Sequence, residues 1–482
     1  MESIMLPSPV DVLHHTSPVQ EKEALSSKNQ TRLSSSISSA CENSCNWGRR
    51  NRHGSWLHSL GCLGVMCLAP LLVIFYFITL NHFHGSISLS SKLLLEIGPL
   101  SFFHVYFPQV SSKATFGYTV WYLFQVALYL GLPGQISTGQ LTPAGNLLKY
   151  KTNGLSAWIV THVLFLGLSW IGILDPAILA KNWEGLVVAA NVWGFILTGI
   201  AFLKACYFPT HERDRKFSGS RIYDMYMGIE LNPRIGDKFD FKLFTNGRPG
   251  IVAWTLIDFS FIAYQYQLHG YITNSILIST LLHTFYVVDF FINEDWYLRT
   301  IDICHDHFGF YLAWGSSIWL PFMYTLQTQY LAQNPYSLST PLATLITLLG
   351  LSGYVLFRCV NHQKDLARRT RGDCKIWGKP AKILTVRYKT KDGEEHQSLL
   401  LVSGFWGWAR HVNYAGDLVL SAMMCAAAGG GGDLLPWTYL IFMGVLLVHR
   451  CWRDEERCRE KYGPGWIDYC KTVRWVIFPG IY

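Results

Sequence analysis

The sequence has little charge and lacks the motifs of the common nucleotide-binding folds. Only 15% of its 482 residues are Asp, Glu, Lys or Arg, whereas soluble domains carry about 25%. Neither GxGxxG nor GxxxxGK followed by Ser or Thr occurs, so neither a Rossmann domain nor a P-loop is predicted. The 12 cysteines include no CxxC pair, which argues against a zinc site and a disulfide framework. No bound metal ion is expected.

Hydrophobic residues, in contrast, make up 50% of the chain. Residues 60–80 contain no charged side chain, and a helix of about 20 residues crosses a hydrocarbon core of about 30 Å. Further spans are predicted at residues 116–132, 156–174, 186–203, 251–268, 271–290, 308–326, 337–357, 418–428 and 434–448. Because only helices satisfy their own backbone in lipid, we predict an all-α polytopic membrane protein with about ten transmembrane helices.

A polar segment precedes the first span. Residues 1–55 are rich in Ser, Asn and Gln, and their composition is typical of a disordered tail. Arg49, Arg50 and Arg52 lie just before the first span, and the positive-inside rule therefore places the N-terminus in the cytosol. The membrane domain is predicted to comprise residues 56–482.

A second polar segment, residues 358–398, is rich in Lys and Arg. In residues 381–389, apolar and polar side chains alternate loosely, as in a β-strand, and residues 391–394 have the composition of a turn. Together they predict a β-hairpin whose return strand includes residues 399–402. The positive charge is consistent with membrane topology alone. Nucleic acid is not an expected partner, because no recognisable nucleic-acid-binding fold accompanies the charge.

Two groups of polar side chains follow membrane segments at helical spacing. Lys364 and Arg368 are four residues apart and would share one helix face. After the last span a stripe of the same spacing comprises Arg450, Asp454, Cys458 and Tyr462, with Arg457 and Lys461 beside it; Trp406, Asn413 and Tyr414 lie between the two groups. These side chains suit a phosphate-bearing dinucleotide, because cations bind phosphates and aromatic rings stack on bases. The alternative is a solvated juxtamembrane helix with an aromatic belt.

Acids and histidines gather near one predicted membrane boundary. They are Asp289, Glu294, Asp295, Asp302, His305, Asp306 and His307, beside Tyr286 and Tyr311. An acid at the bilayer centre costs about 2.5 to 3.5 kcal/mol, so such residues are functional candidates. They could line a proton-donating cavity. His305 and His307 are a poor metal pair, because side chains two residues apart on a helix point in different directions.

Several of these segments resemble the sterol reductase family of membrane enzymes, which includes sterol C14 reductases and the lamin B receptor. GIELNPRIG, LLVSGFWG, ARHVNYAGDL and HRCWRDEERCREKYGPGW match its signatures in order, across residues 56–482. TNGRPGIVAW, DICHDHFGFYL and NHQKDLARRT are most similar to the branch that acts on 7-dehydrocholesterol.

The resemblance implies an NADPH-dependent reductase of cholesterol biosynthesis in the endoplasmic reticulum membrane. Its cofactor pocket would lie in residues 358–482 and open to the cytosol. By motif, the cofactor contacts fall on Lys364, Arg368, Leu401, Trp406, Asn413, Tyr414, Asp454, Cys458, Arg459, Glu460, Lys461, Tyr462 and Tyr469. The bilayer would supply the sterol, and other sterol-biosynthesis enzymes are possible partners.

The implied reaction reduces the C7=C8 double bond of a Δ5,7 sterol. An alkene is a poor hydride acceptor, so an acid must protonate it before hydride is added, with both groups held on a dry, fixed substrate. The resemblance assigns delivery of the proton to Tyr286 or Asp454, with Tyr311 as the alternative match for the tyrosine and cofactor binding as the alternative role of Asp454. The alternatives are a C14 reductase acting on Δ14 sterols, and a sterol-binding scaffold without catalysis. A transporter is disfavoured because no repeated half is seen.

Overall fold

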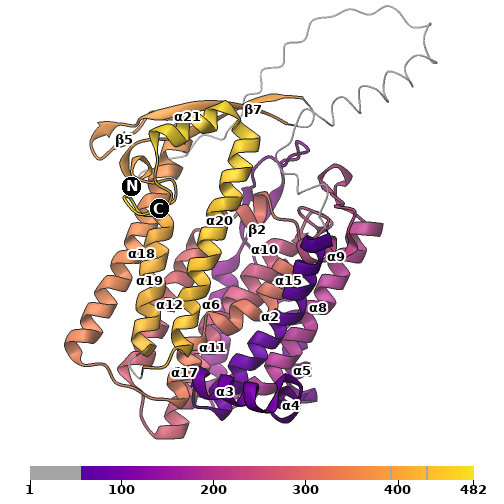
Figure 1. Ribbon diagram of the computed structural model, residues 1–482, viewed down its shortest axis with the longest axis vertical. Coiled ribbons are helices and arrows are strands. Elements are labelled where there is room, and N and C mark those ends of the chain that lie inside the picture. Colours follow the sequence, from indigo (N-terminus) through magenta and orange to yellow (C-terminus); the bar gives the residue numbers. More distant parts are fainter. Residues whose placement is uncertain (1–55, 391–392, 430–431) are drawn as a thin grey trace, which may run out of the picture. The chain divides into compact units, whose positions relative to one another are not determined.

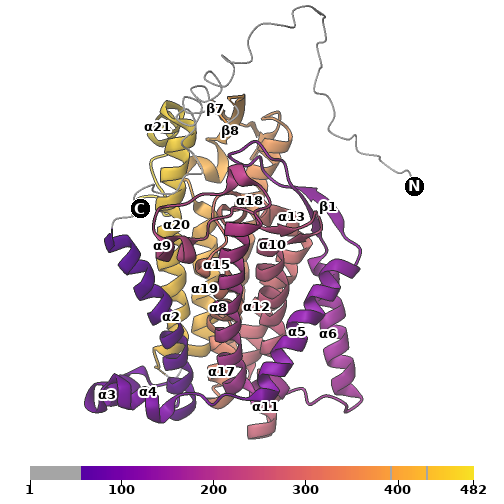
Figure 2. The ribbon, with the colours of Figure 1, turned by 90° about the vertical axis from the view of Figure 1, so that its right-hand side faces the viewer.

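The computed structural model of the protein describes residues 56–390, 393–429 and 432–482, so the predicted tail of residues 1–55 lies outside the described residues. Most of the described chain is helical (Figures 1 and 2). The longer helices are α2 (Trp56–His82), α3 (Ile87–Ile97), α4 (Pro99–Tyr106), α5 (Ser112–Gly131), α6 (Gly154–Trp170), α8 (Trp183–Tyr207), α9 (Arg221–Met227), α11 (Val252–His269), α12 (Asn274–Ile292), α17 (Leu326–Gln333), α18 (Thr340–Arg369), α19 (Val412–Ala428), α20 (Thr438–Tyr462) and α21 (Pro464–Thr472).

Short helices and strands connect these elements. The short helices are α7 (Ile178–Lys181), α10 (Phe241–Thr245), α13 (Glu294–Tyr297), α14 (Ile301–Cys304), α15 (Phe310–Trp314) and α16 (Leu320–Met323). The strands pair as antiparallel two-stranded sheets: β1 (Gln135–Thr138) with β2 (Lys149–Thr152), β3 (Arg234–Ile235) with β4 (Phe239–Asp240), β5 (Lys375–Ile376) with β6 (Lys379–Pro380), and β7 (Ile383–Lys389) with β8 (Glu395–Leu401).

Five of the described helical segments are long and apolar enough to cross a membrane. They are α2, α8, α12, α18 and Leu435–Tyr462, which joins a 3-10 turn to α20. Helices α6 and α19 are apolar but shorter. Every predicted span falls on helical structure, and the class of a polytopic helical membrane protein is confirmed. The other predicted spans fall on helices that are shorter or less apolar, so the total of about ten transmembrane helices stays a prediction.

Two of the helical segments contain wide turns where glycine allows close backbone contact. A π-helical turn at Asn246–Ile251 precedes α11, and another at Gly315–Trp319 separates α15 from α16. A Cβ atom at Gly250 would lie 3.0 Å from the backbone oxygen of Ser316, so the two turns meet through their backbones. The predicted span at residues 308–326 is therefore helical from Phe310 to Met323, with a wide turn inside it.

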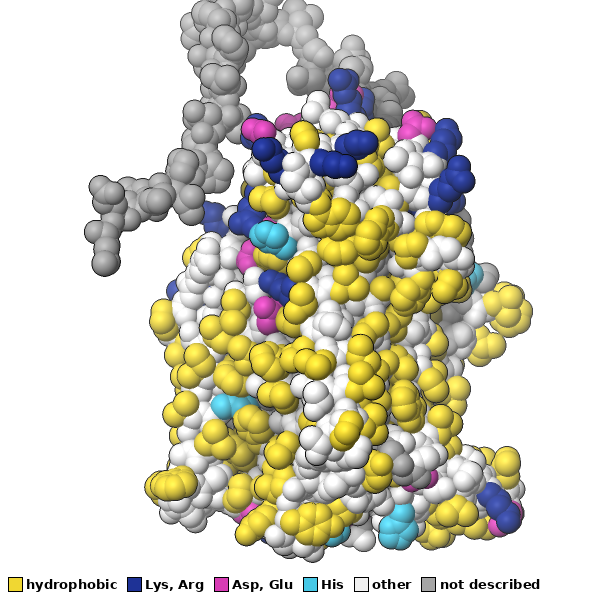
Figure 3. Space-filling view, turned by 90° about the vertical axis from the view of Figure 1, so that its left-hand side faces the viewer, with side chains coloured by type: hydrophobic (Ala, Val, Ile, Leu, Met, Phe, Trp, Pro, Cys, Tyr) yellow, Lys and Arg dark blue, Asp and Glu magenta, His cyan; other side chains and the backbone are white. Residues whose placement is uncertain are grey.

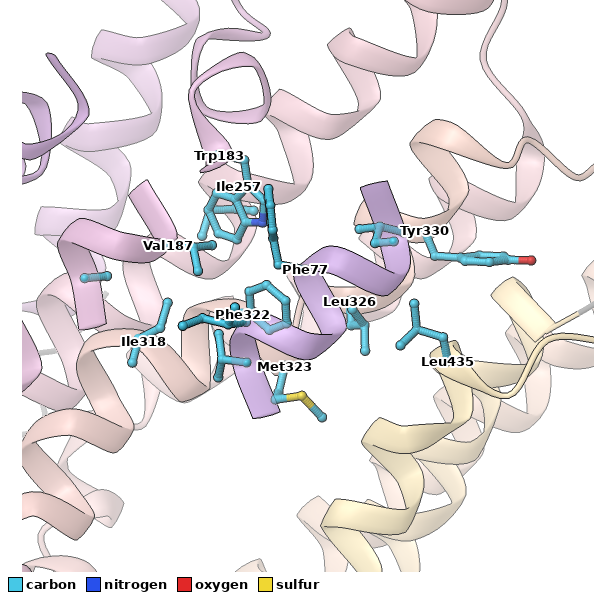
Figure 4. Close-up of a cluster of buried hydrophobic side chains, with 14 of the residues drawn as sticks. Phe77, Trp183, Val187, Ile257, Ile318, Phe322, Met323, Leu326, Tyr330 and Leu435 are labelled. Atoms are coloured by element: carbon cyan, nitrogen blue, oxygen red, sulfur yellow. The ribbon is translucent and has the colours of Figure 1, made fainter. Parts of the chain in front are cut away.

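The largest buried cluster lies between α2, α8, α11 and the helices from α15 to α17 (Figure 4). The rings of Trp183 and Phe322 stack there with centroids 6.2 Å apart, and Phe77 and Ile257 belong to the same cluster. The indole nitrogen of Trp183 donates a hydrogen bond to Gln329 Oε1 at 2.9 Å. Apolar packing and paired polar groups together join these helices.

A buried acid also joins three helices in this part of the bundle. The Oδ2 atom of Asp258 in α11 lies 2.9 Å from Nδ1 of His283 in α12. The hydroxyl of Thr328 in α17 donates to the other carboxylate oxygen at 2.6 Å. The acid that interrupts the hydropathy of α11 is therefore fully paired.

Helices α18, α19 and α20 lie side by side (Figure 1) and carry the cofactor candidates. A Cβ atom at Gly353 of α18 would lie 2.9 Å from the oxygen of Gly416 in α19, and one at Gly416 would lie 2.6 Å from the oxygen of Gly353. Small residues thus let the two backbones touch, as is common between membrane helices. On its outer side α18 exposes Leu345, Leu348 and Val355.

The β7–β8 hairpin and α21 lie at one end of this bundle (Figure 1). The strands pair from Ile383 with Leu401 to Lys389 with Glu395, which confirms the predicted hairpin; its turn residues 391–392 lie outside the described residues. On the face seen in Figure 3, Lys and Arg gather at this end, and hydrophobic side chains cover most of the surface below. This division matches a membrane-embedded body with a polar end.

Candidate cofactor and active site

The predicted cofactor residues come from elements that meet where α18 and α20 end. They are Lys364 and Arg368 from α18, Leu401 from β8, Trp406 from the 3-10 turn Gly404–Gly407, Asn413 and Tyr414 from α19, Asp454, Cys458, Arg459, Glu460, Lys461 and Tyr462 from α20, and Tyr469 from α21. Two apolar clusters connect them: one joins α18, β8 and α19, and the other joins the hairpin, α20 and α21.

Lys364 lies against the indole of Trp406. Its Nζ atom is 4.3 Å from the ring centroid, a distance at which a cation is attracted to an aromatic face. The indole nitrogen of Trp406 donates to the backbone oxygen of Val360 at 2.8 Å, which fixes the ring one turn before Lys364. Trp406 and Leu401 are buried in one cluster, whereas Arg368 is exposed.

Asp454 joins α20 to the start of α19. Its Oδ1 atom accepts a hydrogen bond from Arg457 Nε at 2.9 Å, and its Oδ2 atom lies 3.7 Å from His411 Nε2. The rings of His411 and Tyr414 stack with centroids 5.0 Å apart. Burial lowers the pKa of His411 to about 4 although Asp454 opposes the shift, so the imidazole is neutral at pH 7.

The turn that ends α20 contributes both buried and exposed side chains. Cys458, Tyr462 and Tyr469 are buried against the hairpin, and the Tyr462 hydroxyl lies 3.2 Å from Ser398 Oγ. Burial raises the pKa of the Tyr469 phenol. The side chains of Arg459 and Glu460 are exposed. These two residues are placed in the same turn but not in the cluster of buried side chains.

Positive charge dominates the group of Lys364, Arg368, Asp454, Arg457 and Lys461. Lys364 is close enough to Arg368, Asp454 and Arg457 for Coulombic interaction. Lys461 interacts in the same way with Arg368 and Arg457. Four basic side chains therefore lie around one carboxylate, an arrangement that suits the binding of phosphate groups.

Two arginines of α20 bind α14 and the loop that follows it, a connection that the sequence interpretation missed. Arg450 Nη2 donates to both carboxylate oxygens of Asp302 at 2.8 Å, and Arg453 pairs with Asp306. The spacing contained a signal, because the two acids are four residues apart and the two arginines three.

Other acids near this boundary are also paired. Glu294 binds Arg248 at 2.6 Å, and Asp289 binds Arg358 at 3.2 Å. Asp289, Glu294, Asp302 and Asp306 are therefore each paired with an arginine. The interpretation of this group as the lining of a proton-donating cavity stays a prediction.

Tyr286 of α12 packs among other aromatic rings. Its ring centroid is 5.5 Å from that of Trp254 and 6.3 Å from that of Tyr354. Tyr286 and Tyr414 pack against the same buried cluster of α12, α19 and α20, yet both keep part of their surface accessible. Tyr414 thus connects the two proposed proton donors, because it also interacts with Asp454.

The chain was compared with known proteins. Residues 56–482 match the model of the Ergosterol biosynthesis ERG4/ERG24 family. A 7-dehydrocholesterol reductase of Danio rerio is 48% identical over 450 residues, which cover 90% of this chain and 94% of the relative. A 7-dehydrocholesterol reductase of Xenopus laevis is 47% identical, with coverage of 87% and 91%.

A more distant relative points to a second reaction within the same group. The Delta(14)-sterol reductase of Methylotuvimicrobium alcaliphilum is 37% identical over 420 residues, which cover 87% of this chain and 94% of the relative. The family match and the near-full-length similarities agree with the signatures in the sequence. The chain belongs to the ERG4/ERG24 family of sterol reductases.

Proposed function

We propose that the protein is an NADPH-dependent sterol reductase that reduces the C7=C8 double bond of 7-dehydrocholesterol and related Δ5,7 sterols to give cholesterol-type products. The observation that carries the proposal is the cationic group around Asp454, beside the buried ring of Trp406. Relatives named 7-dehydrocholesterol reductase, 47% and 48% identical, support the choice of double bond.

The side chains present fit a nicotinamide dinucleotide phosphate. Lys364, Arg368, Arg457 and Lys461 offer basic groups for its phosphates, and the partly accessible Tyr414 offers an aromatic ring, while the buried Trp406 holds Lys364 in place. The Oδ1 atom of Asn413 is buried and has no hydrogen-bond partner among the described residues, as expected for an acceptor meant for a ligand amide. When bound, NADPH supplies the hydride.

The protein's own residues would supply orientation and the proton. The Arg450–Asp302 and Arg453–Asp306 pairs fix α20 against α14 and the loop after it, and Asp454 keeps Arg457 in place. Tyr286 lies deeper among the helices, where water is scarce, and its hydroxyl would protonate the alkene so that hydride can add to the resulting carbocation. Asp454 would hold the cofactor or assist this transfer.

Further assignments belong to the same proposal. The C-terminal part, about residues 358–482, forms the cofactor pocket and faces the cytosol, as does the N-terminal tail of residues 1–55. The protein resides in the endoplasmic reticulum and receives its sterol from the bilayer, beside other enzymes of sterol biosynthesis. A C14 reductase is the second candidate, since Delta(14)-sterol reductases are among the relatives.

The test uses membranes that contain the protein, NADPH, and either 7-dehydrocholesterol or a Δ8,14 sterol. Mass spectrometry of the products should show reduction of the first sterol. Reduction of only the second would make the protein a C14 reductase. Binding of both sterols with reduction of neither would favour a scaffold role.

A further inference from the structure

One buried acid differs from all others in the described parts of the chain. Nine buried acids have a hydrogen bond or an ion pair: Asp214, Asp224, Glu230, Asp240, Asp258, Glu294, Asp302, Asp306 and Asp365. Asp417 of α19 is only 9% exposed. It has no side-chain hydrogen bond and no ion pair with any residue among 56–390, 393–429 and 432–482. Burying an acid in a membrane helix without a hydrogen-bond or ion-pair partner costs free energy, so such a residue is a candidate for a functional role.

Asp417 lies on a helix that packs against the helix of the proposed proton donor. It follows Tyr414 by three residues in α19 and so shares a helix face with it. α19 packs directly against α12, which carries Tyr286. Asp417 interacts electrostatically with Tyr286 and Tyr324, and the charge of Arg450 reaches it from α20.

The chemistry of the two groups is complementary. A carboxylate with little access to water and no partner is costly, whereas the neutral carboxylic acid is much less so. A carboxylic acid is also a stronger acid than a phenol, by about six pKa units in water. A tyrosine that has lost its proton beside a protonated carboxyl would therefore regain it at once.

We propose that Asp417 is the proton source for sterol reduction and acts through Tyr286, an inference that rests on the proposed function. The alkene π electrons take the phenol proton of Tyr286, so that its O–H bond breaks and a C–H bond forms. The carboxyl proton of Asp417 then moves to the phenolate oxygen. The Asp417 carboxylate is finally reprotonated by water, and each turnover consumes one proton from water and one hydride from the cofactor.

The test is Asp417→Asn, which keeps the shape of the side chain and removes its proton. We expect kcat for 7-dehydrocholesterol to fall about 10²- to 10⁴-fold, while the KM for sterol and the affinity for NADPH remain unchanged. Asp417→Glu should recover part of the lost turnover. The double variant Asp417→Asn with Tyr286→Phe should be no slower than the slower single variant, because both interrupt one transfer.

Thermal unfolding separates this role from a structural one. Because Asp417 has no partner to lose, Asp417→Asn should unfold at the wild-type temperature or above it. The matched control is Asp258→Asn, which removes a paired buried acid and should unfold at a lower temperature. Wild-type turnover in Asp417→Asn, or a parallel loss of thermal stability and NADPH affinity, would overturn the proposal. A wild-type protein that reduces neither sterol would instead contradict the proposed function.

Discussion

Two regions of the same helix bundle each contain a buried acid, but the acid has side-chain partners in only one of them. Between α11, α12 and α17, the carboxylate of Asp258 is shared by His283 and Thr328. Between α12, α19 and α20, Asp417 has no such partner, and the hydroxyl-bearing ring of Tyr286 lies nearby. A paired acid stabilises the fold, whereas an unpaired acid stores a proton for chemistry.

The largest expected effect comes from the tyrosine of the second region. Tyr286→Phe removes the hydroxyl that passes the proton and leaves the ring packing against Trp254. We expect kcat to fall about 10²- to 10⁴-fold, as measured with purified protein and saturating NADPH. NADPH affinity from fluorescence titration should remain at the wild-type value. Full turnover with normal affinity would remove Tyr286 from the mechanism.

The next effect concerns stability in the first region. Asp258→Asn replaces one of the two carboxylate oxygens by an NH2 group, so the side chain can no longer bind both His283 and Thr328 through acceptor oxygens. The free energy of unfolding should therefore fall by about 1 to 3 kcal/mol. Denaturant unfolding in detergent measures this loss. Turnover per folded molecule should stay close to wild type. A stable Asp258→Asn variant with lost turnover would reverse the roles assigned to the two acids.

A smaller effect is expected at the cofactor group. Lys364→Ala removes one cation and its contact with the Trp406 ring, so NADPH should bind about tenfold more weakly. Isothermal titration with the purified protein gives the affinity. Lys389→Ala in the exposed hairpin is the control, because its partner Glu395 is exposed to solvent and lies outside the cluster. Equal affinities in the two variants would contradict the placement of the cofactor.

The smallest effect is a dependence on pH. The pKa of His411 is about 4 in the folded protein and 6.5 for an ordinary imidazole, so the unfolded chain binds more protons between these values. The stability that the neutral ring confers is complete above pH 6.5 and is lost as the pH falls towards 4. His411→Phe keeps a ring beside Tyr414 and should reduce this acid sensitivity in thermal unfolding. An unchanged pH profile would contradict the assignment.

The sequence predicted the membrane helices and the hairpin well, because long apolar runs and turn residues act locally. It also indicated Lys364 and Asp454 through helical spacing, although their proximity depends on contacts between distant segments. The wide turns near Gly250 and Gly315 were not predicted, because a π-helical turn depends on the backbone that packs against it.

The partners of buried charges were the least predictable feature. Asp302 and Asp306 have the spacing of a helix face, but only the structure shows that Arg450 and Arg453 neutralise them. For Asp417 the informative property is the absence of a partner among the described residues. No sequence pattern can show such an absence.

The central claim is tested most directly by following both hydrogens into the product. Purified protein is given 7-dehydrocholesterol with NADPH that carries deuterium at the transferred position of C4, and separately with unlabelled NADPH in deuterated water. We predict one deuterium in the product from each source, at C7 and C8, with the C5=C6 double bond retained. A product without label from the cofactor, or no reduction at this double bond, would contradict the account.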